Sequence, residues 1–223
     1  MAKGVETGEK IVELVQKGVT TRDILTEEAF ENAVMHLLTM GGSTNGILHL
    51  QAIYHEAGLG ELPLSVFDEF SRRIPQVASI YPASEFDMVD FYEGGGVPAV
   101  LKEIEGFLHK DTLTVSGLTM GEALSRFSYT NNRNMIKTAE EPFAPTGGVA
   151  ILKGNIAPLG CVIKPAAVPK HMFRYSGRAQ VFTTEEESYQ AVLEGRVKPG
   201  TCMVLMYEGA KKADRVCPRC TKP

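Results

Sequence analysis

Two cysteines near the C-terminus are the first residues whose spacing could do chemistry. Cys217 and Cys220 stand two residues apart in "RVCPRCTKP", the spacing of half a zinc knuckle or of a thiol redox pair. Cys161 and Cys202 lie in apolar stretches typical of strands, so we expect them to be core residues. The histidines, at positions 36, 49, 55, 109 and 171, show no HxH, HxxxH or HExxH spacing. The histidine pattern therefore predicts no metal site.

The segment "MGGSTNGILHL" is a second candidate, because two glycines and three small polar residues open a predicted helix. Its candidate site residues are Gly41, Gly42, Ser43, Thr44 and Asn45. Free N–H groups at the positive end of a helix dipole can hold a carboxylate or a phosphate. A helix–helix turn capped by Ser43 or Thr44 explains the same pattern. The pattern leaves both interpretations open.

The elements that must position these residues are helical up to about residue 130. Apolar residues recur at helical spacing over 8–57, with Thr26 as an N-cap. A short helix capped by Ser65 is expected next, and later a glycine turn leads into a helix with Pro98 near its first turn. Residues 111–124 are predicted as a short strand, a turn and a helix.

The pattern becomes β-rich after residue 130. Residues 131–144 are polar and contain proline, so we predict a linker. Four strand-like runs follow, "VAILKGN", "GCVIKPAAV", "RAQVFTT" and "TCMVLMYEG", with one helix among them capped by Thr184 and Glu187. This order indicates a β/α layer domain or half of a barrel, so the predicted fold class is α/β.

Composition and charge exclude several classes of protein. Hydrophobic residues make up 43% and charged residues 22%, as in ordinary globular domains. With a net charge of -4 and no basic stripe, we expect no nucleic-acid partner. No apolar run reaches the ~18 residues of a membrane span, and no secretory signal opens the chain. Four cysteines do not make a disulfide framework, so we expect a cytoplasmic location.

Several segments together resemble one enzyme family. They are "MGGSTNGILHLQAIYHEAG", "GGGVPAVLKE", "DTLTVSG", "PTGGVAILKGNIAPLGCVIKPAAV", "GRAQVF", "EEESYQAVLEGRVKPG" and "MVLMYEG". In this order they are similar to the dihydroxy-acid and 6-phosphogluconate (sugar-acid) dehydratases, and the resemblance runs from about residue 7 to 209. The "KPG" and "YEG" motifs look more like the dihydroxy-acid branch than the sugar-acid (aldonate) branch.

The resemblance implies a hydro-lyase of branched-chain amino-acid biosynthesis. Such enzymes remove water from a small 2,3-dihydroxy acid to leave a 2-oxo acid. An iron–sulfur cluster acts on the leaving hydroxyl, Mg²⁺ grips the substrate, and a serine takes the C2 proton. This division of labour is physically reasonable, because hydroxide is a poor leaving group and the C2–H is barely acidic. The complete enzyme is expected to be a homo-oligomer.

The sequence departs from the family pattern at the residues that do the chemistry. The cluster cysteines and most magnesium ligands belong to a region that would precede residue 1, and the catalytic serine to one that would follow residue 223. Glu208 matches the glutamate of "YEG", which is not a magnesium ligand. We therefore carry no catalytic residue and no metal ligand of the family onto this chain, and expect an internal fragment that is inactive alone.

The C-terminal tail has an explanation in the same resemblance. In the family "YEG" continues roughly as "PKGGPGMPEM", whereas here it continues "AKKADRVCPRCTKP". One chosen back-translation of "ADRVCPRCTKP", prefixed with a G and read from there, spells "GGPGMPEMHQA". We therefore hypothesise that residues 212–223 are frame-shifted family sequence and that the CxxC spacing has no selected chemistry. The codons of the gene decide this.

The predicted organisation follows from these comparisons of pattern. Residues 1–130 resemble the later part of the family's N-terminal α/β domain, 131–144 a linker, 145–211 the first part of its β-barrel-like swivelling domain, and 212–223 the aberrant tail. Two other functions remain open. One is a contribution to an active enzyme through complementation with separately made parts, and the other is a non-catalytic module that binds a small acid or a protein.

Overall fold

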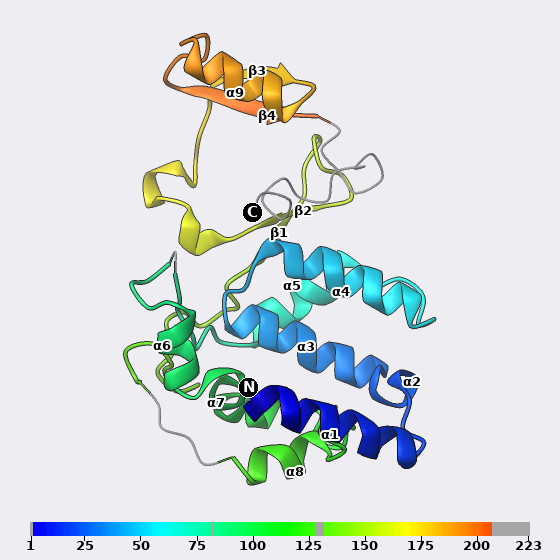
Figure 1. Ribbon diagram of the computed structural model, residues 1–223. Coiled ribbons are helices and arrows are strands. Elements are labelled where there is room, and N and C mark those ends of the chain that lie inside the picture. Colours follow the sequence, from blue (N-terminus) through cyan, green and yellow to red (C-terminus); the bar gives the residue numbers. More distant parts are fainter. Residues whose placement is uncertain (1, 82, 128–131, 207–223) are drawn as a thin grey trace. The chain divides into compact units, whose positions relative to one another are not determined.

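A computed structural model describes residues 2–81, 83–127 and 132–206 (Figure 1). The chain divides into two compact units, residues 1–168 and residues 169–223. We call them the helical unit and the βαβ unit. Helices dominate the first and small sheets follow, so the predicted α/β class is confirmed. Within the described ranges the strands form two two-stranded sheets and no closed barrel.

The helical unit holds most of the secondary structure. Its α-helices are α1 (Ala2–Gln16), α2 (Thr21–Ile24), α3 (Glu27–Thr39), α4 (Thr44–Glu56), α5 (Leu64–Arg73), α6 (Met88–Glu93), α7 (Gly96–Glu103) and α8 (Met120–Ser125). Two 3-10 turns, η1 (Glu105–Phe107) and η2 (Pro165–Ala167), and the strands β1 (Ala150–Leu152) and β2 (Cys161–Ile163) complete it.

Helix α3 lies at the centre of the helical unit and packs against α4, α5 and α7 (Figure 1). Its start follows from the sequence, because the Thr26 side chain accepts a hydrogen bond from the Ala29 N–H at 3.2 Å. Val34 and Leu38 on its inner face are fully buried, as is Phe67 of α5. Burial of such aliphatic and aromatic side chains is the main stabilising contribution to this core.

An extended segment after α5 passes through the same core. Gln76 and Ala78 form isolated antiparallel bridges with Ala144 and Ile136. Residues 132–149, which include most of the predicted linker, contain no helix or strand before β1, yet Met135 and Ile136 are fully buried. This segment is therefore part of the helical unit's core.

The two small sheets differ in topology. Strands β1 and β2 pair antiparallel, and β1 packs against α5. In the βαβ unit, β3 (Arg178–Phe182) and β4 (Thr201–Leu205) pair parallel, with α9 (Glu185–Leu193) between them in the chain and the 3-10 turn η3 (Lys170–Met172) before them. Parallel pairing requires a crossover, and α9 provides it.

Three details of the predicted elements are wrong. Ser65 does not cap α5, because the helix begins at Leu64 and the N-cap is Pro63, whose extended backbone already suits that position. Residues 111–118 form a turn with one isolated bridge instead of a strand. Glu187 does not complete a capping box with Thr184, because its carboxylate accepts from the N–H of Thr183.

The prediction that Cys161 and Cys202 are core residues is also wrong, because both are exposed. The strands that carry them were predicted correctly. Each strand lies in a two-stranded sheet, and the other described residues leave both cysteine side chains uncovered. Strand periodicity predicts the apolar face but not the layer that should cover it.

The predicted domain division at 131–144 stays a prediction. The structural division lies after Val168, which places β1 and β2 in the helical unit. The predicted tail of residues 212–223, including Cys217 and Cys220, lies outside the described residues, as does Glu208.

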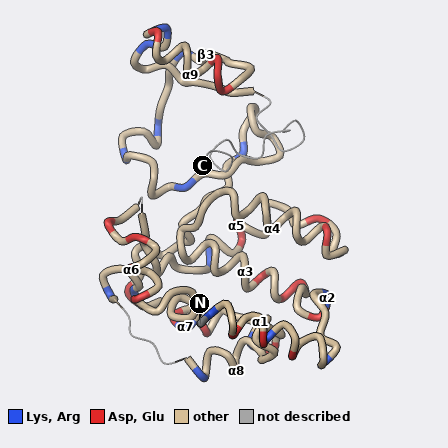
Figure 2. Tube along the Cα trace, in the orientation of Figure 1, with Lys and Arg blue, Asp and Glu red and all other residues tan. Residues whose placement is uncertain are grey.

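Charged residues of both signs are interspersed along the helices (Figure 2). On α5, Arg72 pairs with Asp68 at 2.9 Å and Arg73 with Glu69 at 3.1 Å, both one turn apart. Exposed pairs of this kind contribute little to stability. Among the described helices, none is both long enough and apolar enough to cross a bilayer.

Candidate functional site: the α3–α4 turn and the groove beside it

The predicted site residues form the tight turn between α3 and α4. Gly41 has a φ of +57°, a left-handed conformation that favours glycine, and it is buried. Ser43 is the N-cap of α4, and its hydroxyl accepts from the Asn45 N–H at 3.3 Å. Ser43, Thr44 and Asn45 are exposed. The structure therefore brings the five residues together at an open helix N-terminus.

The glycines of this turn meet a second glycine motif about 100 residues away. The Gly148 N–H donates to the Leu38 carbonyl at 2.8 Å. A Cβ atom added at Gly148 would lie 2.3 Å from the Gly41 Cα, closer than real side chains approach. "MGGSTNG" and "PTGGVA" thus need glycine where their backbones touch, which is a structural reason for both motifs.

Two further glycines of the turn accommodate one leucine. A Cβ atom at Gly42 would lie 2.5 Å from the Leu37 Cδ1, and one at Gly46 would lie 2.7 Å from it. Leu37 of α3 therefore packs directly on the start of α4. The N–H of Gly46 donates to the Ser43 carbonyl at 2.9 Å, so two of the first three amides of α4 already bond to Ser43. This leaves limited donor capacity for a substrate carboxylate.

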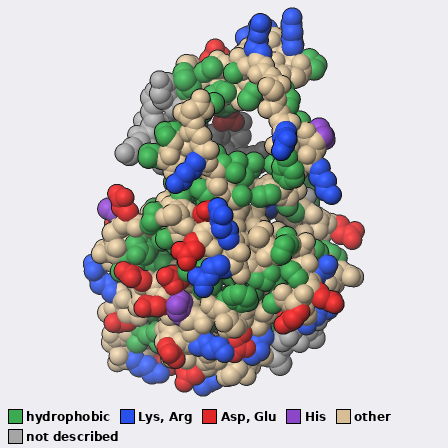
Figure 3. All heavy atoms as spheres, turned by 180° about the vertical axis from the view of Figure 1, so that it is seen from behind, with side chains coloured by type: hydrophobic (Ala, Val, Ile, Leu, Met, Phe, Trp, Pro, Cys, Tyr) green, Lys and Arg blue, Asp and Glu red, His purple; other side chains and the backbone are tan. Residues whose placement is uncertain are grey.

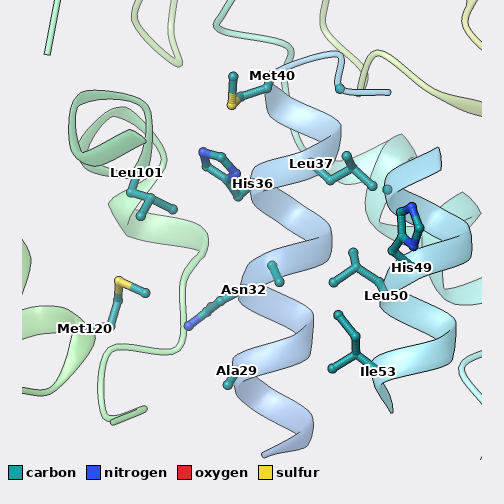
Figure 4. Close-up of a pocket in the computed structure, with 13 residues that line it drawn as sticks. Ala29, Asn32, His36, Leu37, Met40, His49, Leu50, Ile53, Leu101 and Met120 are labelled. Atoms are coloured by element: carbon teal, nitrogen blue, oxygen red, sulfur yellow. The ribbon is translucent and has the colours of Figure 1, made fainter. Parts of the chain in front are cut away.

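A groove of about 510 Å³ runs beside this turn. It is lined by α3 and α4, with Leu101 of α7 and Met120 of α8 on the far side of α3 (Figure 4). Leu50 and Ile53 of α4 lie across from them, and most of the lining is apolar. Sequence reasoning missed this groove, because its walls come from segments that are far apart in the chain.

His36 is the unusual polar residue of the groove. Its Nε2 atom is buried and has no hydrogen-bond partner among the described residues. Burial lowers the pKa of the His36 imidazole from 6.5 to about 4, so the ring is neutral near pH 7. The sequence signal was a histidine among the inward-facing positions of α3, which alone does not separate a packed histidine from a functional one.

No constellation for metal chemistry accompanies the groove. Within the described ranges, no three side chains among His, Cys, Asp and Glu come together in a way that could hold a metal ion. His109 contacts Glu31 at 2.5 Å, but this is a pair at the surface. The geometry of this part of the chain is that of a packed scaffold.

Comparison with known protein families shows which family this chain matches. A model described as "Dihydroxy-acid/6-phosphogluconate dehydratase N-terminal" matches residues 2–123, more than half of the chain. The chain belongs to this dehydratase family. The corresponding C-terminal model matches residues 134–215. The resemblance inferred from the motifs is confirmed by both matches.

Several relatives of this chain are named dihydroxy-acid dehydratase. Proteins named dihydroxy-acid dehydratase from Ignicoccus hospitalis, Methanococcoides burtonii and Caldanaerobacter subterraneus subsp. tengcongensis are 44%, 46% and 46% identical over 207, 214 and 208 residues. These alignments cover 92%, 95% and 92% of this chain, but only 37%, 38% and 37% of the relatives. The chain thus spans less than two-fifths of the length of the relatives that it matches, as expected for a fragment.

Proposed function

We propose that residues 1–223 are part of the scaffold of a dihydroxy-acid dehydratase. The complete enzyme would remove water from a 2,3-dihydroxy acid and leave a 2-oxo acid in branched-chain amino-acid biosynthesis. The observation that carries the proposal is the 44–46% identity, along more than nine-tenths of this chain, to relatives with that name. The sugar-acid branch is less favoured, because the relatives compared share the dihydroxy-acid name. We expect a cytoplasmic, homo-oligomeric enzyme.

The described residues do not fit an iron–sulfur cluster or a Mg²⁺ site by themselves. A cluster of this kind needs several thiolates, whereas the two described cysteines, Cys161 and Cys202, belong to different units. A magnesium site needs grouped oxygen ligands, and the described ranges bring no such group of carboxylates together. We therefore derive no catalytic step from this chain, and we assign both groups to family sequence outside it.

Within the complete enzyme, we propose that the turn of Gly41, Gly42, Ser43, Thr44 and Asn45 is substrate-proximal. Its support is the exposed N-terminus of the 13-residue helix α4, where the helix dipole favours an anion. The close glycine contacts show that the turn also has a packing role. Ser43→Ala and Thr44→Ala test the first role, because they leave the glycines in place.

The assay that tests the dehydratase proposal measures release of 2-oxo acid from a branched 2,3-dihydroxy acid. The purified chain, supplied with iron, sulfide and Mg²⁺, should show none. Mixing it with the remaining portions of the Methanococcoides burtonii relative should restore release. Turnover by the isolated chain would overturn the assignment of the catalytic groups to sequence outside it.

A carboxylate-binding measurement distinguishes the dehydratase proposal from the alternative of a module that binds a small acid. Binding of a dihydroxy acid to the isolated chain, lost in Ser43→Ala and Thr44→Ala and without turnover in any mixture, would favour that module. Release of 2-oxo acid in the mixture would favour the dehydratase.

A further inference from the structure

The groove beside α3 makes few polar demands on what fills it, because its polar side chains are Asn32, His36 and the exposed His49. Asn32 is the amide in its lining, and its Nδ2 donates to the His109 carbonyl at 2.9 Å and to the Thr112 hydroxyl at 3.1 Å. Its Oδ1 accepts from the His109 N–H at 2.9 Å. The amide is therefore satisfied internally, and an occupant need not bond to it.

The imidazole of His36 adds no charge to the groove. Its Nε2 is buried rather than presented to the open space, and the low pKa of the ring keeps it neutral. The residues that line the groove include no Lys, Arg, Asp or Glu. A dihydroxy acid, with a carboxylate and two hydroxyls, would lose hydration here and would meet His49 as the one exposed polar side chain of the lining. The groove is thus poorly suited to the proposed substrate.

One aliphatic side chain on the rim of the groove is open to solvent in the described chain. Ile53 is 47% exposed and lies on α4 beside Leu50. Figure 3 shows other apolar side chains at the surface between charged groups, so such exposure is not confined to the groove. A preformed apolar groove of about 510 Å³ is large enough for several aliphatic side chains.

The length of the relatives points to a source for an occupant. More than three-fifths of each compared relative lies outside the stretch that this chain matches. We propose that the α3 groove is the seat for aliphatic side chains from dehydratase sequence outside residues 1–223. In this role the groove would join the scaffold to the remainder of the enzyme. This inference rests on the proposed function. The proposed occupant is thus a polypeptide of the same enzyme rather than its substrate, and a second copy of this chain is an outcome that the experiment distinguishes.

The experiment co-expresses the tagged full chain with the two portions of the Methanococcoides burtonii relative that flank its matched stretch. Co-purification should yield a complex. Ile53→Glu, which places a carboxylate in the groove, should lower the amount of complex at least tenfold, because an occupant would have to bury that carboxylate without a partner. Ala52→Glu is the matched control, because Ala52 is exposed on the same helix, is the neighbouring residue and does not line the groove. It should change the amount less than twofold.

A second experiment avoids the need for the flanking portions to fold on their own. Residues 1–206 replace the matched stretch in the full-length relative, and the same two variants are compared by thermal melting. Ile53→Glu should lower the Tm more in this chimaera than in the isolated chain, whereas Ala52→Glu should lower it little in both. Circular dichroism of the isolated Ile53→Glu chain establishes that the helical unit still folds.

Several outcomes would overturn the proposal. Equal losses for the two variants in both formats would show that the groove is not the contact. A dimer of the isolated chain that Ile53→Glu dissociates would make a second copy the occupant. Complex formation unaffected by Ile53→Glu, even with full turnover, would refute the seat while leaving the dehydratase function intact. Conversely, association that needs Ile53 but never yields turnover would refute the function alone.

Discussion

The helical unit and the βαβ unit were built from the same kinds of residues but differ in how well they bury them. In the helical unit, α3, α5, α7 and the extended segments around residues 77 and 136 share one core of fully buried side chains. In the βαβ unit, Phe182 and Ala191 are the buried hydrophobic residues among those described, while Tyr189 and Leu193 are 60% and 62% exposed. Apolar side chains thus form a buried core only where several helices and extended segments pack against one another.

The physical reason lies in the sheet type. Parallel sheets are normally covered on both faces, and two strands with a single helix cover one face at most. The described residues of the βαβ unit therefore leave more of their apolar side chains uncovered than those of the helical unit do. This comparison predicts different responses to equivalent changes in the two units.

The largest expected effect is in the helical core. Phe67→Ala should lower the free energy of unfolding by about 3–5 kcal/mol, because Phe67 is fully buried and its removal leaves a cavity. Urea unfolding followed by far-UV circular dichroism measures the loss. A loss below about 1 kcal/mol would mean that the core around α5 is not packed as described.

The matching change in the βαβ unit is Phe182→Ala. Phe182 is 2% exposed and is one of the few anchors of that unit, so its removal should abolish amide protection along β3 and β4. Hydrogen exchange should show unchanged protection in α3 and α5, because they belong to the other unit. Equal loss of protection in both units would show that they unfold as one, and would remove the contrast between them.

Protonation of His36 should make the stability of the helical unit depend on pH. Its folded pKa is about 4 and its unfolded pKa about 6.5, so between these values the unfolded state binds more protons. The free energy of unfolding should therefore fall as pH drops from 6.5 toward 4, by about 2 kcal/mol at pH 5. Urea unfolding at pH 7.5 and pH 5 measures this difference.

Two variants isolate the contribution of His36. His36→Phe should remove most of that pH-dependent difference, since the ring is replaced by one that cannot titrate. His171→Phe, at an exposed position of the βαβ unit, should leave it unchanged. If His36→Phe keeps the full pH dependence, other groups cause it and the buried Nε2 is irrelevant to stability.

Local signals in the sequence predicted the helices well, because their ends depend on nearby residues. Thr26 caps α3 as its pattern indicates, and α8 lies within the stretch where a helix was predicted. Helix α6 was missed, although Asp87 and Asp90 form a capping box at its start, because its six residues lie just before the glycine run. Ser65 failed as a cap because the proline two residues earlier took that place.

The candidate site could be predicted only in part. The run "GGSTN" predicted a turn at a helix start, but its contact with Gly148 depends on a segment 100 residues away. The groove at His36 likewise needs Leu101 and Met120, which no local pattern connects to α3. Exposure of Cys161 and Cys202 was unpredictable for a related reason, since a strand pattern does not reveal which layers are present.

The smallest predicted effects compare helix caps in the two units. Thr119 in the helical unit accepts from the Glu122 N–H at 3.2 Å, and Thr184 in the βαβ unit accepts from the Glu187 N–H at 3.1 Å. Loss of either cap should cost about 1 kcal/mol locally. Thr119→Ala should lower protection of α8 by roughly fivefold without reaching α3, because the surrounding core holds that helix.

Thr184→Ala should have the wider consequence. Helix α9 provides the single described cover of β3 and β4, so weakening its start should raise exchange along both strands by a similar factor. Thr183→Ala is a useful companion, because it removes the Thr183 hydroxyl's bond to Glu187 but leaves the cap of α9 intact. If Thr184→Ala raises exchange only within α9, the helix and the strands do not form one cooperative unit, and the contrast with the helical unit must come from the strands themselves.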